Sequence, residues 1–210
     1  MEQDLKRRVT LAVVKRLARE NEYWIPAAVS NRHVHISAAD REKLFGPGYT
    51  LKVLRPLSQP GQYACEEKLT VVGPKGRIGE VRVLGPERPD TQVEVSLTDT
   101  YKLGIKPYVR MSGELEGTPG CTLIGPAGEV TLDKGVIVAA RHLHISGEEA
   151  KVFGLNNGDV VSARKAGSRE TVFGGIAVRA GEGHSLELHI DTDEANAAGI
   201  KNGDLLELLR

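Results

Sequence analysis

The pattern of apolar and polar positions divides the chain into an amphipathic helix and a longer β-rich part. Within residues 2–21, Leu5, Val9, Val13 and Leu17 recur every four positions with charged residues between them, which predicts a helix. Such a helix either packs on its own domain or a dimer partner, or docks on another protein as a targeting helix.

The remaining chain consists of short apolar or alternating segments that Gly and Pro turns separate, a pattern typical of strands. Segments 69–86, 121–132 and 160–179 each predict a strand, a turn and a second strand. The first two share a Gly-Pro-x-Gly turn, in which proline fixes φ and glycine accepts a positive φ. With 24 glycines and few long helical patterns, barrels or sandwiches are favoured over alternating strand–helix units.

Short helices interrupt the strands. The sequence predicts them within 37–46, 146–154 and 191–204. In the second of these, Ser146 and Glu149 form the pattern of a capping box, and Gly154 suits a left-handed C-terminal cap. Ser37 and Gly46 hold the corresponding places in the first helix.

The two halves of the chain repeat one another. The sequences RHVHIS and RHLHIS contain four of the six histidines, and each precedes a predicted helix that ends in Phe-Gly. Residues 93–106 also align with residues 188–201 through their Gly-Ile-Lys ends, which places Glu94 at the position of His189. Both matches fit an ancient duplication that produced two related β-barrels.

The spacing of the histidines has a chemical meaning. Residues i and i+2 of a strand point to one face, so each His-x-His pair projects two imidazoles together. Glu94 and His189 fall on the polar faces of their own strands, so each half offers three candidate metal ligands. The candidates are His33, His35 and Glu94 in the first half, and His142, His144 and His189 in the second. Imidazole and carboxylate suit Zn²⁺, and these residues are enough for two metals with open, catalytic positions.

Three further polar residues distinguish the halves. Arg88 precedes the Glu94 strand, and the second half has no arginine at the matching place. Arginine can bind phosphate bidentately, although Arg88 also fits a solvated loop residue. Ser30 has an alanine as its counterpart, so it supplies a hydroxyl in one half only. His184 has no partner pattern and is expected to be an ordinary loop residue.

Composition and charge limit the remaining classes. The chain has 210 residues, and its 28 basic and 28 acidic residues cancel, which argues against a general nucleic-acid binder. It has no apolar run of transmembrane length and no secretory signal, so we expect no membrane association and a cytoplasmic location. Cys65 and Cys121 form no motif and are expected to be reduced thiols.

Six motifs carry a family resemblance that runs from about residue 26 to the end of the chain. They are SNRHVHIS, LSQPGQYACEE, LGPERPDTQVEVSLTD, RMSGELEGTPG, ARHLHIS and LELHIDTDEANAAG. Together they resemble the PduL type of the phosphate propanoyltransferase family, which comprises zinc-dependent phosphotransacylases. The resemblance implies a reversible reaction in which acyl-CoA and phosphate give acyl phosphate and CoA. It also implies two Zn²⁺ ions per chain, coenzyme A as a substrate, and a homodimer.

The resemblance also implies a fold and its boundaries. The expected fold class is mainly β, with two small duplicated β-barrels capped by short helices, and with an N-terminal helix. The helix covers 1–21, and one barrel combines 22–31 with 140–210. The other barrel covers 32–139 and contains a hairpin insertion near 54–66.

Site roles carry over by motif in the same way. The implied metal ligands are His33 and His35 for one zinc, and Glu94, His142, His144 and His189 for the other. Arg88 and Ser30 would bind phosphate, and Arg88, His33 and His35 would act in catalysis. Some family members use an N-terminal amphipathic helix for encapsulation in a bacterial microcompartment. Shell or core proteins would then be partners of residues 2–21, and the compartment would be the alternative location.

Two alternatives from other classes stay open at this point. A metal-dependent hydrolase of a thioester or related substrate often carries His-x-His on a barrel strand, although such chains usually alternate strands and helices. A non-enzymatic metal-binding or microcompartment interaction module would bind zinc without turnover.

Overall fold

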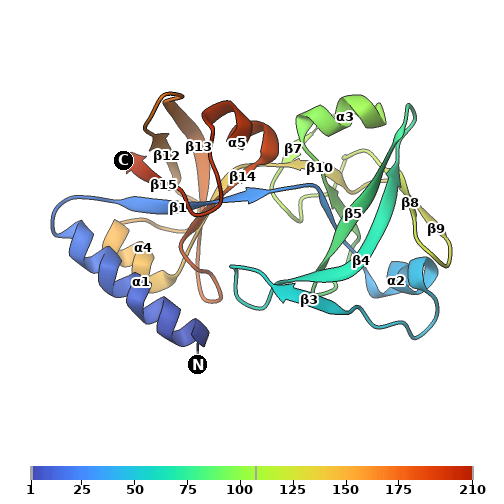
Figure 1. Cartoon of the computed structure of the whole chain (residues 1–210), viewed down its shortest axis with the longest axis horizontal. Coiled ribbons are helices and arrows are strands. Elements are labelled where there is room, and N and C mark those ends of the chain that lie inside the picture. The colour runs from blue at the N-terminus through green and yellow to red at the C-terminus, as the bar shows by residue number, and fades with distance from the viewer. Residues whose placement is uncertain (1, 107, 210) are drawn as a thin grey trace. The chain divides into compact units, whose positions relative to one another are not determined.

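The chain folds into two compact units, each with its own core (Figure 1). The computed structural model describes residues 2–106 and 108–209. One unit combines Met1–Ser30 with Ala140–Arg210 and is called the barrel unit, whereas Asn31–Ala139 form the sheet unit. The predicted fold class, mainly β with short helices and an N-terminal helix, is confirmed.

The barrel unit is a closed barrel of six strands in the order β1-β14-β11-β13-β12-β15. They are β1 (Trp24–Ser30), β11 (His142–Ile145), β12 (Val160–Lys165), β13 (Thr171–Ala180), β14 (Glu187–Asp191) and β15 (Leu205–Leu209). Strand β1 is distant from the others in sequence, yet it pairs in parallel with β14 and antiparallel with β15. The chain therefore leaves this unit after Ser30 and returns to it at Ala140.

The helices of the barrel unit are α1 (Glu2–Ala18), α4 (Gly147–Phe153) and α5 (Thr192–Ala198). Helix α1 lies beside α4, where Arg7 and Glu148 approach to 3.7 Å (Figure 1). Among the α1 residues whose burial is described, Val14 enters the core. The expected apolar face is instead exposed at Leu5, Val9 and Val13. None of the helices in the described ranges is both long and apolar enough to span a membrane.

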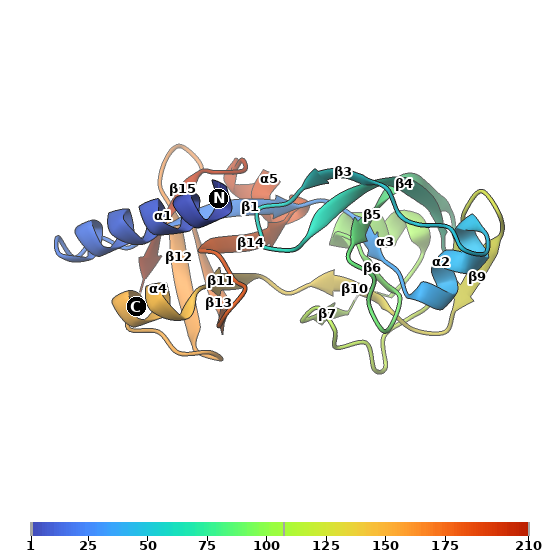
Figure 2. The ribbon, with the colours of Figure 1, turned by 90° about the horizontal axis from the view of Figure 1, so that it is seen from below.

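The sheet unit is a curled sheet of nine strands (Figure 2). Its strands are β2 (His33–His35), β3 (Val53–Pro56), β4 (Tyr63–Val72), β5 (Arg77–Gly85), β6 (Gln92–Glu94), β7 (Val109–Arg110), β8 (Cys121–Ile124), β9 (Glu129–Leu132) and β10 (Val136–Ala139). They follow the order β7-β10-β6-β2-β5-β4-β8-β9, and β3 pairs with β4 as a hairpin. Helices α2 (Ala38–Phe45) and α3 (Leu97–Leu103) complete the unit.

Both units repeat one arrangement around the His-x-His strand. Strand β2 pairs antiparallel with β6 and in parallel with β5. Strand β11 likewise pairs antiparallel with β14 and in parallel with β13. A short helix follows each His-x-His strand. The shared pairing is what a duplication of one ancestral unit produces.

Local capping sets the ends of the short helices. Helix α4 has the predicted capping box between Ser146 and Glu149, and Gly154 ends it with a φ of 65° in the left-handed region. Gly46 ends α2 differently, with φ 104° and ψ 158°. Pro47 follows Gly46, and a residue before proline is pushed toward an extended ψ. The C-terminal cap of α2 therefore differs from that of α4.

The aromatic ends of α2 and α4 lead to a first prediction. Phe153 is 1 % exposed and packs edge-to-face on Tyr23, with ring centroids 5.4 Å apart, whereas its counterpart Phe45 is only half-buried. We expect Phe153→Ala to lower the free energy of unfolding by about 3–5 kcal/mol, because it leaves a cavity in a closed core. Phe45→Ala should cost clearly less. Urea denaturation of both variants tests this, and equal losses would contradict it.

The two cysteines give a second prediction. Burial raises the pKa of the Cys121 thiol to about 12, and burial together with the charge of Glu67 raises that of Cys65 to about 11. The thiolate is the reactive form, so neither side chain should react with a thiol reagent at pH 8 in the folded protein. Both should react after denaturation. Rapid labelling of the native chain would contradict the buried placement.

Candidate functional site

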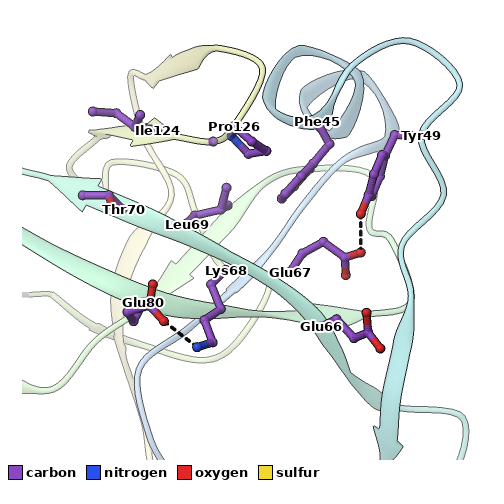
Figure 3. A pocket seen from close by; sticks show the side chains of 11 residues that line it. Phe45, Tyr49, Glu66, Glu67, Lys68, Leu69, Thr70, Glu80, Ile124 and Pro126 are labelled. Atoms are coloured by element: carbon purple, nitrogen blue, oxygen red, sulfur yellow. Dashed lines mark hydrogen bonds and ion pairs between the residues drawn. The ribbon is translucent and has the colours of Figure 1, made fainter.

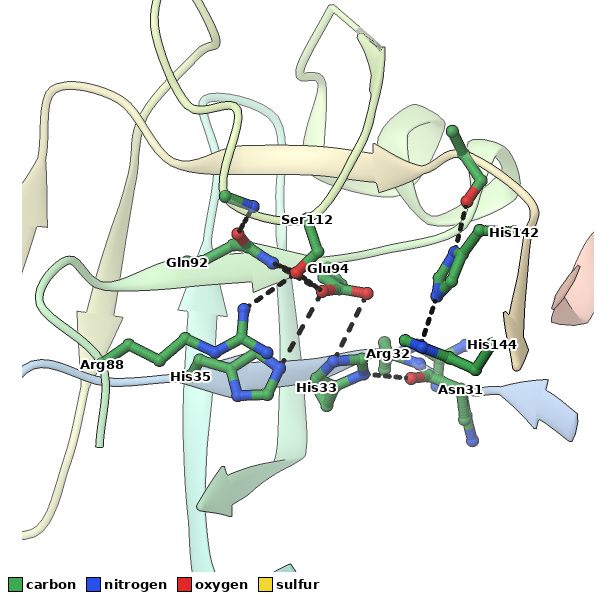
Figure 4. A network of polar contacts seen from close by, with 12 residues as sticks. Asn31, Arg32, His33, His35, Arg88, Gln92, Glu94, Ser112, His142 and His144 are labelled. Atoms are coloured by element: carbon green, nitrogen blue, oxygen red, sulfur yellow. Dashed lines mark hydrogen bonds and ion pairs between the residues drawn. The ribbon is translucent and has the colours of Figure 1, made fainter. Parts of the chain in front are cut away.

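Three ligand-capable side chains meet on one face of the sheet unit (Figure 4). Strand register pairs His33 with Glu94 and His35 with Gln92 across β2 and β6. One ligand atom each of His33, His35 and Glu94 lies within 4.8 Å of the other two. Val34, between the histidines, points into the apolar core. The alternation of the strand therefore separates the ligands from the core, as the sequence predicts.

The Glu94 carboxylate is oriented by two neighbours. Its Oε1 accepts hydrogen bonds from Gln92 Nε2 at 2.5 Å and from Ser112 Oγ at 3.1 Å. Its Oε2 lies 3.4 Å from Nε2 of His33. Gln92 is itself fixed, because its Oε1 accepts from the backbone N–H of Gly113 at 2.8 Å. One carboxylate oxygen is thus held by the protein while the other faces the imidazole, as metal-binding carboxylates require.

Electrostatics favour the metal-binding protonation states of Glu94 and His35. Burial opposes ionisation of Glu94, but the His33 and His35 imidazoles and the Arg88 guanidinium hold its pKa well below the usual range. Burial, and next the neighbouring His33, lower the pKa of His35 to about 3. Burial also works against a charge on His33, yet the Glu94 charge and its hydrogen bond raise that pKa. At neutral pH the set therefore contains an ionised carboxylate and a neutral His35.

Arg88 reaches this group through Ser112. Its Nη1 donates to Ser112 Oγ at 2.8 Å, and its backbone N–H donates to the carbonyl of Ile36 at 3.0 Å. Ser112 Oγ also accepts from Gln92 at 2.9 Å and donates to Glu94. A hydroxyl has one donor and two acceptor positions, and these contacts use all three. Ser112 therefore links the candidate phosphate arginine to the candidate metal carboxylate.

Sequence reasoning missed Gln92 and Ser112. The i, i+2 rule that linked the histidines could have found Gln92, which stands two positions before Glu94 on the same strand. Ser112 belongs to the segment after β7, and no spacing pattern marks it. Ser30, the other expected phosphate ligand, is the last residue of β1 and pairs with Asp191 in the barrel unit. The two residues expected at phosphate thus belong to different units.

The barrel unit holds the second group. His142 and His144 lie on β11, and register pairs His142 with His189 on β14. One ligand atom of each lies within 4.8 Å of the others, and Nε2 of His142 is 3.0 Å from Nε2 of His144. Two nitrogens bound at 2.0–2.1 Å to one tetrahedral zinc stand about 3.3 Å apart. The pair is therefore already near the spacing that a shared metal requires.

Both units fix the first histidine of each pair in the same way. Nδ1 of His33 contacts the carbonyl oxygen of Asn31 at 2.8 Å. Nδ1 of His142 contacts the carbonyl oxygen of Ala140, also at 2.8 Å. A carbonyl can only accept, so each Nδ1 carries the proton and each Nε2 remains for a metal. The internal repeat therefore includes the hydrogen bond between each of these Nδ1 atoms and the carbonyl two residues earlier.

Two residues outside the expected set support the barrel-unit group. His189 Nε2 contacts Glu187 Oε2 at 2.8 Å. His184 lies in the loop before β14, as expected, but its Nδ1 is 2.9 Å from Nδ1 of His144, so it is not an ordinary loop residue. Burial, followed by neighbouring imidazoles, lowers the pKa of His144 to about 2 and keeps that ring neutral. No spacing pattern marks His184.

Both groups fit zinc. Each offers three nitrogen or oxygen donors of the types that Zn²⁺ prefers, and three protein ligands leave a position open for water or substrate. The family resemblance implies that Glu94 shares a zinc with His142, His144 and His189. Within the sheet unit, the antiparallel register of β6 on β2 brings Glu94 beside His33 and His35.

The sheet unit also has a hollow of about 490 Å³ beside α2 and β4 (Figure 3). Phe45 and Tyr49 stack at its rim, with ring centroids 5.2 Å apart. Glu67 accepts hydrogen bonds from the Tyr49 hydroxyl at 2.8 Å and from the backbone N–H of Lys52 at 3.0 Å. None of the candidate metal ligands lines this hollow. The buried Glu67 carboxylate therefore holds the segment that follows α2 through these hydrogen bonds.

Comparisons with known proteins identify the family of this chain. The model of a protein family described as phosphate propanoyltransferase matches residues 26–201. A phosphate propanoyltransferase of Thermotoga maritima is 50 % identical over 167 residues, covering 79 % of this chain and 80 % of the relative. One of Rhodobacter capsulatus is 50 % identical over 164 residues, covering 78 % and 76 %, and one of Salmonella typhimurium is 51 % identical over 165 residues, covering 78 % of each. The chain therefore belongs to the phosphate propanoyltransferase family and is an acyltransferase enzyme.

Proposed function

We propose that this protein transfers a short acyl group reversibly between coenzyme A and inorganic phosphate, at a site that holds two Zn²⁺ ions. The observation that carries the proposal is the oriented Glu94 carboxylate between two imidazoles, joined through Ser112 to Arg88. Metal ligands and an anion-binding side chain thus share one hydrogen-bonded group. Family membership supports phosphate acyltransferase activity independently.

The two ligand groups would hold one zinc each. His33, His35 and Glu94 form the set in the sheet unit, and the three histidines His142, His144 and His189 form the set in the barrel unit. When bound, zinc would polarise a thioester carbonyl and stabilise the CoA thiolate. The backbone carbonyls behind His33 and His142 would keep these two ligands in their metal-binding tautomers.

Arg88 would position phosphate for attack. A guanidinium presents a fork of N–H donors that matches two phosphate oxygens, and its charge offsets part of the phosphate charge. Ser112 holds one arm of that fork in place. Ser30 is proposed as a further phosphate-binding residue, through its hydroxyl.

The transfer needs no covalent intermediate on the protein. A phosphate oxygen would attack the thioester carbonyl, forming the new C–O bond, and the C–S bond would break as CoA leaves as a thiolate. The reverse reaction returns the acyl group to the sulfur. Cys65 and Cys121 are buried, and burial raises the pKa of both thiols, so neither suits the role of nucleophile. A trapped acyl-enzyme would contradict this scheme.

Neither alternative class gains support. The relatives that match most of the chain are named phosphate propanoyltransferase, which does not favour a hydrolase or a module without turnover. The closed barrel has six strands, and it contains both parallel and antiparallel strand pairs. It therefore differs from the barrels of repeating strand–helix units that are common among metal-dependent hydrolases.

Assembly and location extend the proposal. We propose two duplicated domains with the boundaries expected from the sequence, a homodimer, and a cytoplasmic location or encapsulation in a microcompartment. The exposed side chains of Leu5, Val9 and Val13 form one stripe of α1 and support docking of residues 2–21 on a shell or core protein.

An assay of CoA release tests the proposed reaction. With acetyl-CoA or propanoyl-CoA, we expect release of CoA only when phosphate is present, together with formation of an acyl phosphate that hydroxylamine traps. Chelation should abolish turnover, and added Zn²⁺ should restore it. CoA release without phosphate would favour a hydrolase, and tight zinc binding with no turnover would favour the interaction module.

Arg88 gives a sharper prediction. Arg88→Ala should raise the phosphate KM by about 10- to 100-fold, because charge-assisted hydrogen bonds to phosphate are lost. The KM for acyl-CoA should stay nearly constant. Ser112→Ala should shift the phosphate KM in the same direction by less, since the guanidinium remains but loses its support. The exposed Arg77, in the same unit, provides the matched control Arg77→Ala. An unchanged phosphate KM with full kcat in Arg88→Ala would contradict the proposed role of Arg88 in phosphate binding.

A further inference from the structure

We infer that His184 is a positioning residue of the barrel-unit metal group, which sets the tautomer and orientation of His144. This inference rests on the proposed function, because it concerns a metal that the group would hold. His184 and His144 face each other through their Nδ1 atoms at 2.9 Å, with ring centroids 4.5 Å apart. The contact joins a loop residue to a candidate ligand on β11.

The contact leaves Nε2 of His144 for the metal. A nitrogen–nitrogen hydrogen bond contains one proton, so one Nδ1 donates and the other accepts. When Nε2 of His144 binds a metal, the ring proton must stand on Nδ1, and Nδ1 of His184 becomes its acceptor. His184 then carries its own proton on Nε2. On metal binding, His144 loses the proton on Nε2, and the proton shared between the two Nδ1 atoms moves to His144. His184 takes one proton from solvent on its Nε2. The total charge of the two imidazoles therefore does not change.

The loop is built to hold His184 in this place. Residues 181–186 connect β13 to β14, and the backbone N–H of Gly181 donates to the carbonyl of Ile145 at 3.1 Å. Ile145 follows His144 on β11, so the loop is attached next to the histidine that it supports. The position of His184 is therefore tied to the strand that carries the ligand.

The other ligands of this group have a different kind of partner. His142 is fixed by the carbonyl of Ala140, and His189 contacts the carboxylate of Glu187. In the sheet unit the counterpart of His144 is His35, whose Nδ1 has no side-chain partner among the described residues. His184 is thus a feature of one half only, and it completes a set in which every barrel-unit ligand has an outer partner.

Substitutions at His184 separate hydrogen bonding from packing. His184→Asn keeps an acceptor, because Asn Oδ1 is attached to Cγ as the ring Nδ1 is. His184→Leu keeps a side chain of similar reach without an acceptor. Both are made in the full chain and in a His33→Ala/His35→Ala background, where two of the three sheet-unit candidates are removed and zinc binding reports mainly the barrel-unit group.

The measurement is Zn²⁺ affinity by competition with a chromogenic chelator, with Co²⁺ absorption as a report of ligand geometry. We expect His184→Leu to weaken zinc binding at the barrel-unit group by about 10- to 100-fold and to alter the Co²⁺ spectrum. His184→Asn should bind nearly as tightly as the parent. If the leucine variant binds like the parent, or the asparagine variant binds as weakly as the leucine variant, the inference is wrong.

A second readout uses the unaltered protein. In the zinc-loaded chain, ¹⁵N NMR shifts of the imidazoles should show His144 protonated at Nδ1 and His184 protonated at Nε2. A His144 that binds zinc through Nδ1 would overturn the inference while the acyltransferase proposal stands. A parent chain that binds no zinc at this group would instead remove the metal part of the proposed function, and the inference with it.

Discussion

The antiparallel pairing of each His-x-His strand with the strand of its third candidate ligand determines the geometry of both ligand groups. His33 stands across from Glu94, and His142 stands across from His189. The neighbouring apolar pairs, Val34 with Val93 and Leu143 with Leu188, are buried in the two cores. A slip of one residue would expose these pairs and turn the third ligand to the opposite face, so hydrophobic burial fixes the ligand geometry.

Burial of charge is the second constraint, and the two groups meet it differently. An unpaired carboxylate in an apolar environment is costly, and Glu94 avoids this cost through Gln92, Ser112 and the adjacent imidazoles. The barrel-unit group contains imidazoles alone as ligands. A zinc ion there would keep its full positive charge, whereas Glu94 would offset part of the charge of a zinc in the sheet unit. The two ions would then differ in Lewis acidity although their frames are related.

Features that depend on local periodicity were predictable from the sequence. The strand–turn–strand segments, the capping box of α4 and the shared face of each histidine pair all follow from rules that act over a few residues. The packing face of α1 was not predictable in this way, because one buried contact at Val14 prevails over the stripe of Leu5, Val9 and Val13. The position of Glu94 beside His33 and His35 depends on strand register, which is nonlocal, and the internal repeat indicated that register.

Two of the residues that escaped prediction share a physical origin. Ser112 and His184 both lie outside strands, and each reaches a ligand through a single side-chain contact. Strand positions repeat between the halves because they must satisfy the same register and core. Connecting segments carry no such constraint and can differ while the frame stays intact. Arg88 and Ser112 beside one group, and His184 beside the other, are additions of this kind. The duplicated strands therefore supply two similar frames of candidate metal ligands, and the loops make the two frames chemically unequal.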